Sequence, residues 1–151
     1  MTSRYREIDR AARALSVTVQ ALGVREPDDF EAAFSAMRRE RPDALFMVSD
    51  VLTSLNRKRV IEFAAMHRIP AMFEFSSVVQ DGGLMSYGPG FEDSFQRIAN
   101  YVDRVLKGAK PGDLPLEQPT RFYLFLNLKT AKAVGIKIPQ SILLRADKVI
   151  E

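Results

Sequence analysis

Segment 43–50 constrains the fold of this chain more than any other stretch. Its residues 44–48 form an unbroken apolar run, and Ser49 and Asp50 end that run. A strand with one wet face alternates apolar and polar residues, whereas a strand covered on both faces does not. The run therefore predicts a buried strand of a parallel sheet, and we expect residues 45–48 at the centre of that sheet.

Short strands of this kind alternate with amphipathic helices along the chain. Further strands are predicted at 17–22, 69–75, 84–87 and 121–127, and helices at about 3–15, 29–41, 54–67, 91–107, 128–134 and 140–150. Short connectors separate most of them, which is typical of βα units. The pattern predicts the α/β class: a three-layer parallel sheet with helices on both faces.

The amino-acid composition excludes several kinds of catalytic and metal-binding site. The chain of 151 residues has no cysteine and one histidine, His67, which excludes disulfides, thiolate zinc sites, cysteine nucleophiles and a multi-histidine metal site within one chain. Phosphate-binding glycine motifs and the G-x-S-x-G of serine hydrolases are also absent. We therefore expect no enzyme, no cofactor and no metal.

Charge and hydropathy indicate whether the chain binds nucleic acid or a membrane. Twenty-two basic and nineteen acidic side chains leave a net charge of +3, and the basic residues lack interleaved aromatics, so we expect no nucleic-acid binding. No apolar run approaches the eighteen or so residues that span a bilayer. The first fifteen residues contain no signal-peptide core.

Four strand-end residues are the candidate ligand-binding site. Ligands of open parallel sheets bind beyond the carboxyl ends of the strands, and the residues expected there are Ser49, Asp50, Phe75 and Tyr87. Phe75 and Tyr87 either offer flat apolar rings to a ligand or are ordinary core residues. Asp50 either meets a polar or cationic ligand group or caps the next helix. Glu74 is expected to be an exposed strand residue.

A second interpretation of Asp50 is a phospho-accepting aspartate, as in a receiver-like signalling domain. Such a domain needs an acidic pair after its first strand and a lysine after its last. Here the first predicted strand ends at Leu22, and the last is followed by Leu128 and Lys129 without the matching proline. The receiver-like domain stays the alternative to a binding module.

Several segments in fixed order resemble the ABC transporter substrate-binding protein family, of the tryptophan and tyrosine type. They are DDFEAAF (28–34), ERPDAL (40–45), RIPAM (68–72), GGLMSYGP (82–89), 101–111, 113–119, 122–130 and the ending 138–151. Members are about twice this length, so the chain resembles the carboxyl-terminal half only. The resemblance implies one lobe of a type I periplasmic-binding-protein fold over residues 1–151. Residues 84–108 would cross to a missing first lobe, and 119–151 would return.

The resemblance also implies a function. The chain would be the solute-binding component of an ABC import system, holding a small amino-acid-like metabolite in an inter-lobe cleft without catalysis. Ser49, Asp50, Phe75 and Tyr87 would face that cleft, and an ABC permease would be the partner. The implied location is periplasmic or extracytoplasmic. Because this chain shows no signal peptide, we expect a cytoplasmic location if it is the whole product.

The predicted helix at 91–107 carries the widest apolar stripe of the chain. Its members are Phe91, Phe95, Ile98, Val102, Val105 and Leu106. The resemblance places this helix in a lobe whose other strands the chain lacks, and a wet apolar stripe of this size favours association. Either the helix folds back onto its own lobe or a second copy covers it. We expect a homodimer, with exchange through residues 84–127.

Overall fold

The computed structural model describes residues 3–151, apart from the side chains of Ser3 and residues 91–93. The chain divides into two compact units, residues 1–40 and 41–151. The first unit contains two helices, α1 (Ser3–Ala14) and α2 (Asp29–Glu40). The inner side of α2 consists of Phe30, Ala33, Phe34 and Met37. Both helices follow the apolar spacing of the sequence.

The strand predicted at 17–22 is wrong. These residues have no regular structure and most of their side chains are exposed. A strand is stable only when a neighbour satisfies its N–H and C=O groups. In the described part of the chain, no strand pairs with this segment. Its β-branched composition alone therefore does not produce a strand.

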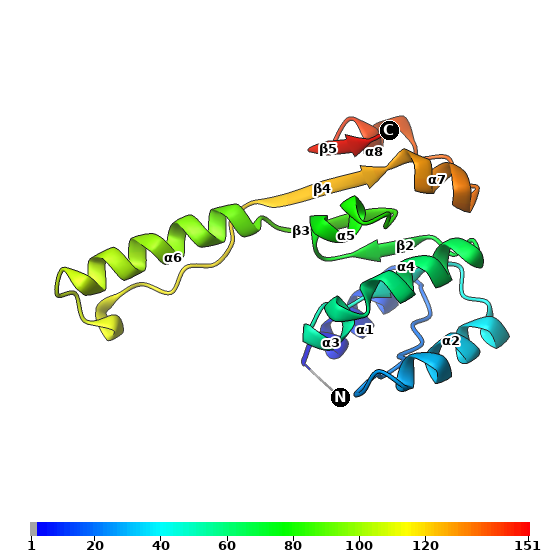
Figure 1. Cartoon of the computed structure of the whole chain (residues 1–151), viewed down its shortest axis with the longest axis horizontal. Coiled ribbons are helices and arrows are strands. Elements are labelled where there is room, and N and C mark those ends of the chain that lie inside the picture. Colours follow the sequence, from blue (N-terminus) through cyan, green and yellow to red (C-terminus); the bar gives the residue numbers. More distant parts are fainter. Residues whose placement is uncertain (1–2) are drawn as a thin grey trace. The chain divides into compact units, whose positions relative to one another are not determined.

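The second unit is built on one five-stranded sheet (Figure 1). The strands are β1 (Leu45–Met47), β2 (Ala71–Phe73), β3 (Met85–Pro89), β4 (Phe122–Asn127) and β5 (Lys148–Ile150), and their spatial order is their order in the chain. Helices alternate with these strands. The predicted α/β class is confirmed.

The sheet is mixed and not wholly parallel. Three neighbouring pairs are parallel, but β3 and β4 are antiparallel, with Tyr87 opposite Leu124. Between them lies the helix α6 (Phe91–Leu106), followed by residues 107–121, which we call the strap. Helix and strap lead away from the carboxyl end of β3 and return to the same edge (Figure 1). The chain therefore re-enters the sheet where β3 ended, and β4 must run in the opposite direction.

The central position predicted for residues 45–48 is also wrong. In the described sheet β1 is an edge strand, paired with β2 alone. Phe46 is 43% exposed, whereas Met47, on the other face of the strand, is buried. The apolar run therefore predicts neither that both faces of the strand are covered nor how many strands lie beside it.

Two predicted helices have different bounds or a different structure. The helix predicted at 54–67 is two helices, α3 (Val51–Leu55) and α4 (Arg57–Met66), separated at Asn56. The helix predicted at 140–150 is only α8 (Gln140–Leu143), because its second half forms β5 and pairs with β4. The otherwise unpaired side of β4 offers backbone hydrogen-bond partners to residues 148–150. These residues form a strand there although their own sequence pattern is weak.

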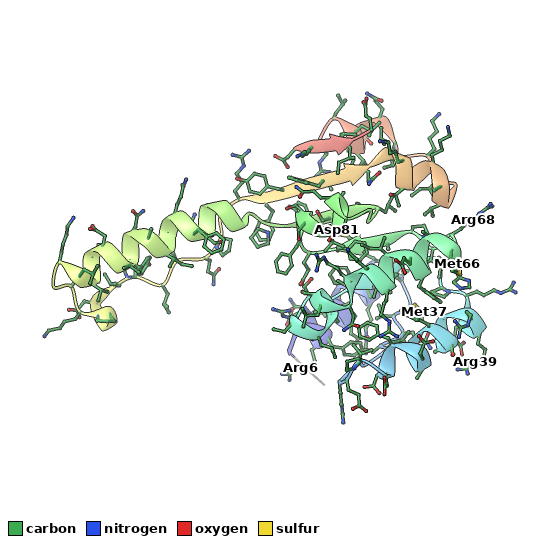
Figure 2. The ribbon with its side chains drawn as sticks, viewed as in Figure 1. Arg6, Met37, Arg39, Met66, Arg68 and Asp81 are labelled. Atoms are coloured by element: carbon green, nitrogen blue, oxygen red, sulfur yellow. The ribbon has the colours of Figure 1, made fainter. Side chains whose placement is uncertain are left out.

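One face of the sheet holds the core. Ala71, Phe73, Leu84 and Ser86 point to this face and are at most 3% exposed. Above them pack α4, through Ile61 and Ala64, and α7 (Leu128–Val134), through Val134. Helix α5 (Ser76–Gln80) contacts β3 and β4, and Asp81 after it, labelled in Figure 2, accepts a 2.6 Å hydrogen bond from Arg57. None of the described helices is long and apolar enough to cross a membrane.

Candidate functional site

The ends of three neighbouring strands form the candidate site. Ser49 and Asp50 follow β1, and Glu74 and Phe75 follow β2. The register pairs Phe73 with Ser86, which brings Tyr87 of β3 level with Glu74. Because β1, β2 and β3 are parallel, these residues lie together along one edge of the sheet, the edge formed by the carboxyl ends of the three strands. The first residue of β4, Phe122, is at the same edge, since β4 is antiparallel to β3.

Glu74 connects the ends of β1 and β2. The backbone N–H of Ser49 donates a 2.8 Å hydrogen bond to the Glu74 carboxylate. Ser49 is 6% exposed and Glu74 is half-buried. The expectation of a solvated Glu74 is therefore wrong: the residue holds the β1 end in place and brings a negative charge to the site.

Asp50 caps α3. Its carboxylate accepts a 2.8 Å hydrogen bond from the Thr53 backbone N–H, and the Thr53 hydroxyl accepts one of 2.9 Å from the Asp50 backbone N–H. This reciprocal pair is a capping box. Of the two roles left open by the sequence, the structure shows the cap. Asp50 is also exposed, so its charge can still act on a ligand.

Two aromatic rings form an apolar surface at this edge. Tyr87 stacks on Phe122 with ring centroids 5.6 Å apart and an angle of 28° between the planes. Their side chains are 50% and 47% exposed, so one side of the pair is open to solvent. Phe75, at the N-cap position of α5, is half-buried. Phe122 could not be assigned from the sequence, because the antiparallel register of β3 and β4 brings it to Tyr87.

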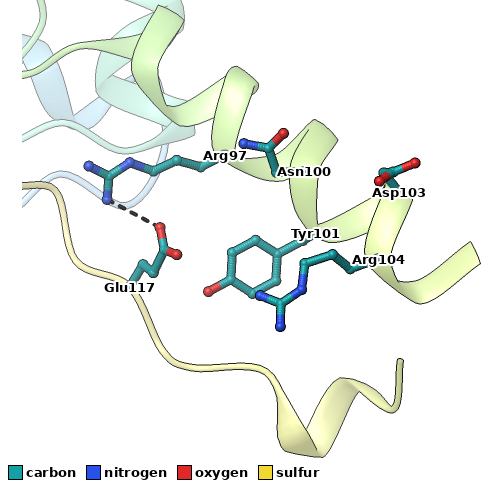
Figure 3. A pocket seen from close by; sticks show the side chains of 6 residues that line it. All are labelled: Arg97, Asn100, Tyr101, Asp103, Arg104 and Glu117. Atoms are coloured by element: carbon teal, nitrogen blue, oxygen red, sulfur yellow. Dashed lines mark ion pairs between the residues drawn. The ribbon is translucent and has the colours of Figure 1, made fainter. Parts of the chain in front are cut away.

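A separate, strongly charged hollow lies between α6 and the strap. It has a volume of about 330 Å³ and is lined by Arg97, Asn100, Tyr101, Asp103, Arg104 and Glu117 (Figure 3). The pKa of Tyr101 is raised above its usual value, first by desolvation and then by the negative charge of Glu117. None of the strand-end residues lines this hollow, so it is distinct from the candidate site. Among the described residues, no three His, Asp or Glu side chains are grouped to hold a metal ion.

A sheet edge with open aromatic rings and carboxylates is characteristic of an α/β ligand-binding protein. The chain belongs to the ABC transporter substrate binding protein family, whose model matches residues 2–150. No curated protein matches the sequence significantly.

Solved structures share the fold of this chain. An ABC domain from Streptococcus pneumoniae, in complex with L-Trp, is 26% identical with a TM-score of 0.88, over 98% of this chain and 51% of its own. A conserved domain protein from Vibrio cholerae is 23% identical with a TM-score of 0.90. The match covers 97% of this chain and 49% of that protein. A ligand-free, open substrate binding protein with adhesive properties from Clostridium difficile is 19% identical with a TM-score of 0.68. The match covers 97% of this chain and 48% of that protein. The chain thus spans about half the length of these proteins.

Proposed function

We propose that this chain is one half of a solute-binding component of an ABC import system, and that it binds a small amino-acid-like metabolite without catalysing a reaction. The ligand contacts are Ser49, Asp50, Phe75 and Tyr87, and the geometry adds Glu74 and Phe122. One observation carries this proposal: the half-exposed Tyr87–Phe122 pair shares its sheet edge with two carboxylates. Rings bind an apolar side chain, and carboxylates bind an ammonium group.

The family match and the L-Trp complex of the Streptococcus pneumoniae domain support an amino-acid-like ligand. The coverage of the relatives supports a type I arrangement of two halves, with residues 84–108 crossing to the other half and 119–151 returning. The family match supports an ABC permease as partner and an extracytoplasmic location. The homodimer expected from the sequence, with exchange through residues 84–127, remains part of the same proposal.

Amino-acid binding can be tested on the chain itself by NMR titration of the ¹⁵N-labelled protein with L-Trp and other amino acids. We expect chemical-shift changes at the backbone amides of Ser49, Asp50, Phe75 and Tyr87. Tyr87→Ala should weaken binding at least tenfold, about 1.4 kcal/mol. Asp50→Asn should do the same, because asparagine keeps the α3 cap but removes the charge.

Tyr101→Ala is the matched control, since it removes a tyrosine from α6 far from the strand ends. It should leave the affinity unchanged. If Tyr87→Ala and Asp50→Asn also bind with wild-type affinity, these residues are not in the site. The receiver-like alternative predicts a different result, Mg²⁺-dependent phosphorylation of Asp50. The family assignment favours solute binding over that alternative.

A further inference from the structure

Phe122 lies at an exposed end of the sheet, where the strand itself holds it weakly. It is the first residue of β4 and pairs with Pro89, the last residue of β3. Its side chain is 47% exposed, and its ring stacks on Tyr87. The terminal residues of a strand open most easily, because no further hydrogen-bonded pair lies beyond them. A fixed ring at this position therefore needs support from the residues that precede it.

The backbone of those preceding residues provides no such support. Segment 115–120, near the end of the strap, has no regular secondary structure, and within the described residues it makes no backbone–backbone hydrogen bond. Every residue of this segment is exposed, so burial in a core does not order it either. A segment of this kind takes one conformation only where side chains satisfy its polar groups. Side-chain contacts must therefore order the strap before it enters β4.

Arg97 of α6 provides these contacts. Its guanidinium donates hydrogen bonds to the Gln118 carbonyl (2.9 Å) and to the Thr120 hydroxyl (3.1 Å). It also pairs with the Glu117 carboxylate at 3.5 Å, and Figure 3 shows Arg97 extending from α6 towards Glu117. A guanidinium has five N–H donors in one rigid plane, so it can hold several acceptors in a single geometry. We call this set of contacts the Arg97 clamp.

The Arg97 clamp joins α6 to the start of β4. Helix α6 begins at Phe91, a member of the predicted apolar stripe whose side chain lies outside the described residues. It leaves the sheet directly after Pro89, the residue that pairs with Phe122. Arg97 lies about 9 Å further along the helix, at 1.5 Å per residue, and its acceptor Thr120 is two residues before Phe122. Phe122 is thus held from two sides, by its pairing with β3 and by the clamp.

We propose that Arg97 is a positioning residue of the candidate ligand-binding site, which holds the Phe122 ring against Tyr87 before a ligand arrives. This inference rests on the proposed function, in which the two rings contact the ligand. An ordered ring pair binds more tightly than a mobile one, because binding then loses less side-chain entropy. Arg97 acts through the strap and not on the ligand, since it lines the separate hollow between α6 and the strap.

Arg97→Lys tests the clamp on the protein without ligand. Lysine keeps the charge but cannot hold two acceptors in the plane of a guanidinium. In NMR relaxation, the order parameter of the Phe122 amide should fall from about 0.85 to below about 0.6, and the NOEs between the Tyr87 and Phe122 rings should weaken. Arg104→Lys is the matched control, because Arg104 lines the same hollow but makes no hydrogen bond to the strap among the described residues. It should leave both signals unchanged.

Substitutions of Thr120 separate the clamp from a general effect of changing α6. Thr120→Val removes the hydroxyl that accepts the hydrogen bond from Arg97, with little change in volume, and should loosen Phe122 in part. Thr120→Ser keeps the hydroxyl and should match the wild type. Urea denaturation should give nearly the same midpoint for all these variants, because they lie at the surface. A mobile Phe122 in a protein of unchanged stability is the result that a positioning role predicts.

Calorimetric titration with L-Trp connects the clamp to the ligand site. Arg97→Lys should weaken binding about three- to tenfold, and Arg104→Lys should leave it unchanged. A Phe122 ring that stays ordered and stacked in Arg97→Lys would overturn the proposal, and so would a loosened ring with wild-type affinity. Failure of the wild-type chain to bind L-Trp would instead contradict the proposed ligand. The relaxation and NOE measurements would then decide on the clamp, since they need no ligand.

Discussion

At the scale of single residues, Gly88 leaves no room for a side chain at the candidate site. A Cβ at this position would lie 2.0 Å from the carbonyl oxygen of Glu74. Gly88→Ala must therefore displace β3 from the end of β2, and we expect a loss of about 1–3 kcal/mol in the free energy of unfolding. Urea denaturation followed by circular dichroism measures this loss.

Gly112→Ala is the control for this prediction, because a Cβ at that position has no atom within 4 Å. It should change the stability by less than about 0.5 kcal/mol. Equal stabilities of the two variants would show that β3 and Glu74 do not approach as closely as the structure has them. The close contact between Gly88 and the Glu74 backbone also holds Tyr87 beside Glu74, so it helps to position the residues of the candidate site.

At the scale of elements, Asn127 joins β4 to α7. Its side chain is 5% exposed, accepts a 3.0 Å hydrogen bond from the Thr130 backbone N–H as the N-cap, and donates one of 3.4 Å to the Val79 carbonyl. We expect Asn127→Ala to lower the free energy of unfolding by about 1–2 kcal/mol. Chemical denaturation measures the change.

Asn127→Ser separates the two roles of this side chain, because serine caps a helix about as well as asparagine but cannot reach Val79. Its loss should be smaller than that of Asn127→Ala. Identical losses in the two variants would mean that the cap contributes nothing and that only the buried contact to Val79 matters.

At the scale of the whole molecule, the division into residues 1–40 and 41–151 has a consequence for folding. The first unit contains two helices of 12 residues each. Isolated helices of this length are marginal in water, and about 40 residues rarely bury enough apolar surface to fold alone. A peptide of residues 1–40 should therefore be mostly unfolded by circular dichroism. Full helix content in the isolated peptide would contradict this expectation.

The sequence alone determined the features that depend on local pattern. Periodicity predicts α1, α2, α6 and α7, and the apolar runs locate β1 to β4. The α/β class follows from their alternation, and the rule for strand ends selects Ser49, Asp50, Phe75 and Tyr87 as candidates. These inferences hold because a helix or a buried strand is encoded by neighbours within a few residues of each other.

Only the tertiary structure decided what depends on partners distant in the chain. Pairing with β2 alone makes β1 an edge strand, and pairing with β4 turns residues 148–150 into a strand. The antiparallel register of β4 brings Phe122 to Tyr87, and the hydrogen bond from Ser49 brings Glu74 into the site. The physical reason is the same in each case. A hydrogen-bonded or stacked partner 23 or more residues away leaves no periodic signal in the segment that it stabilises.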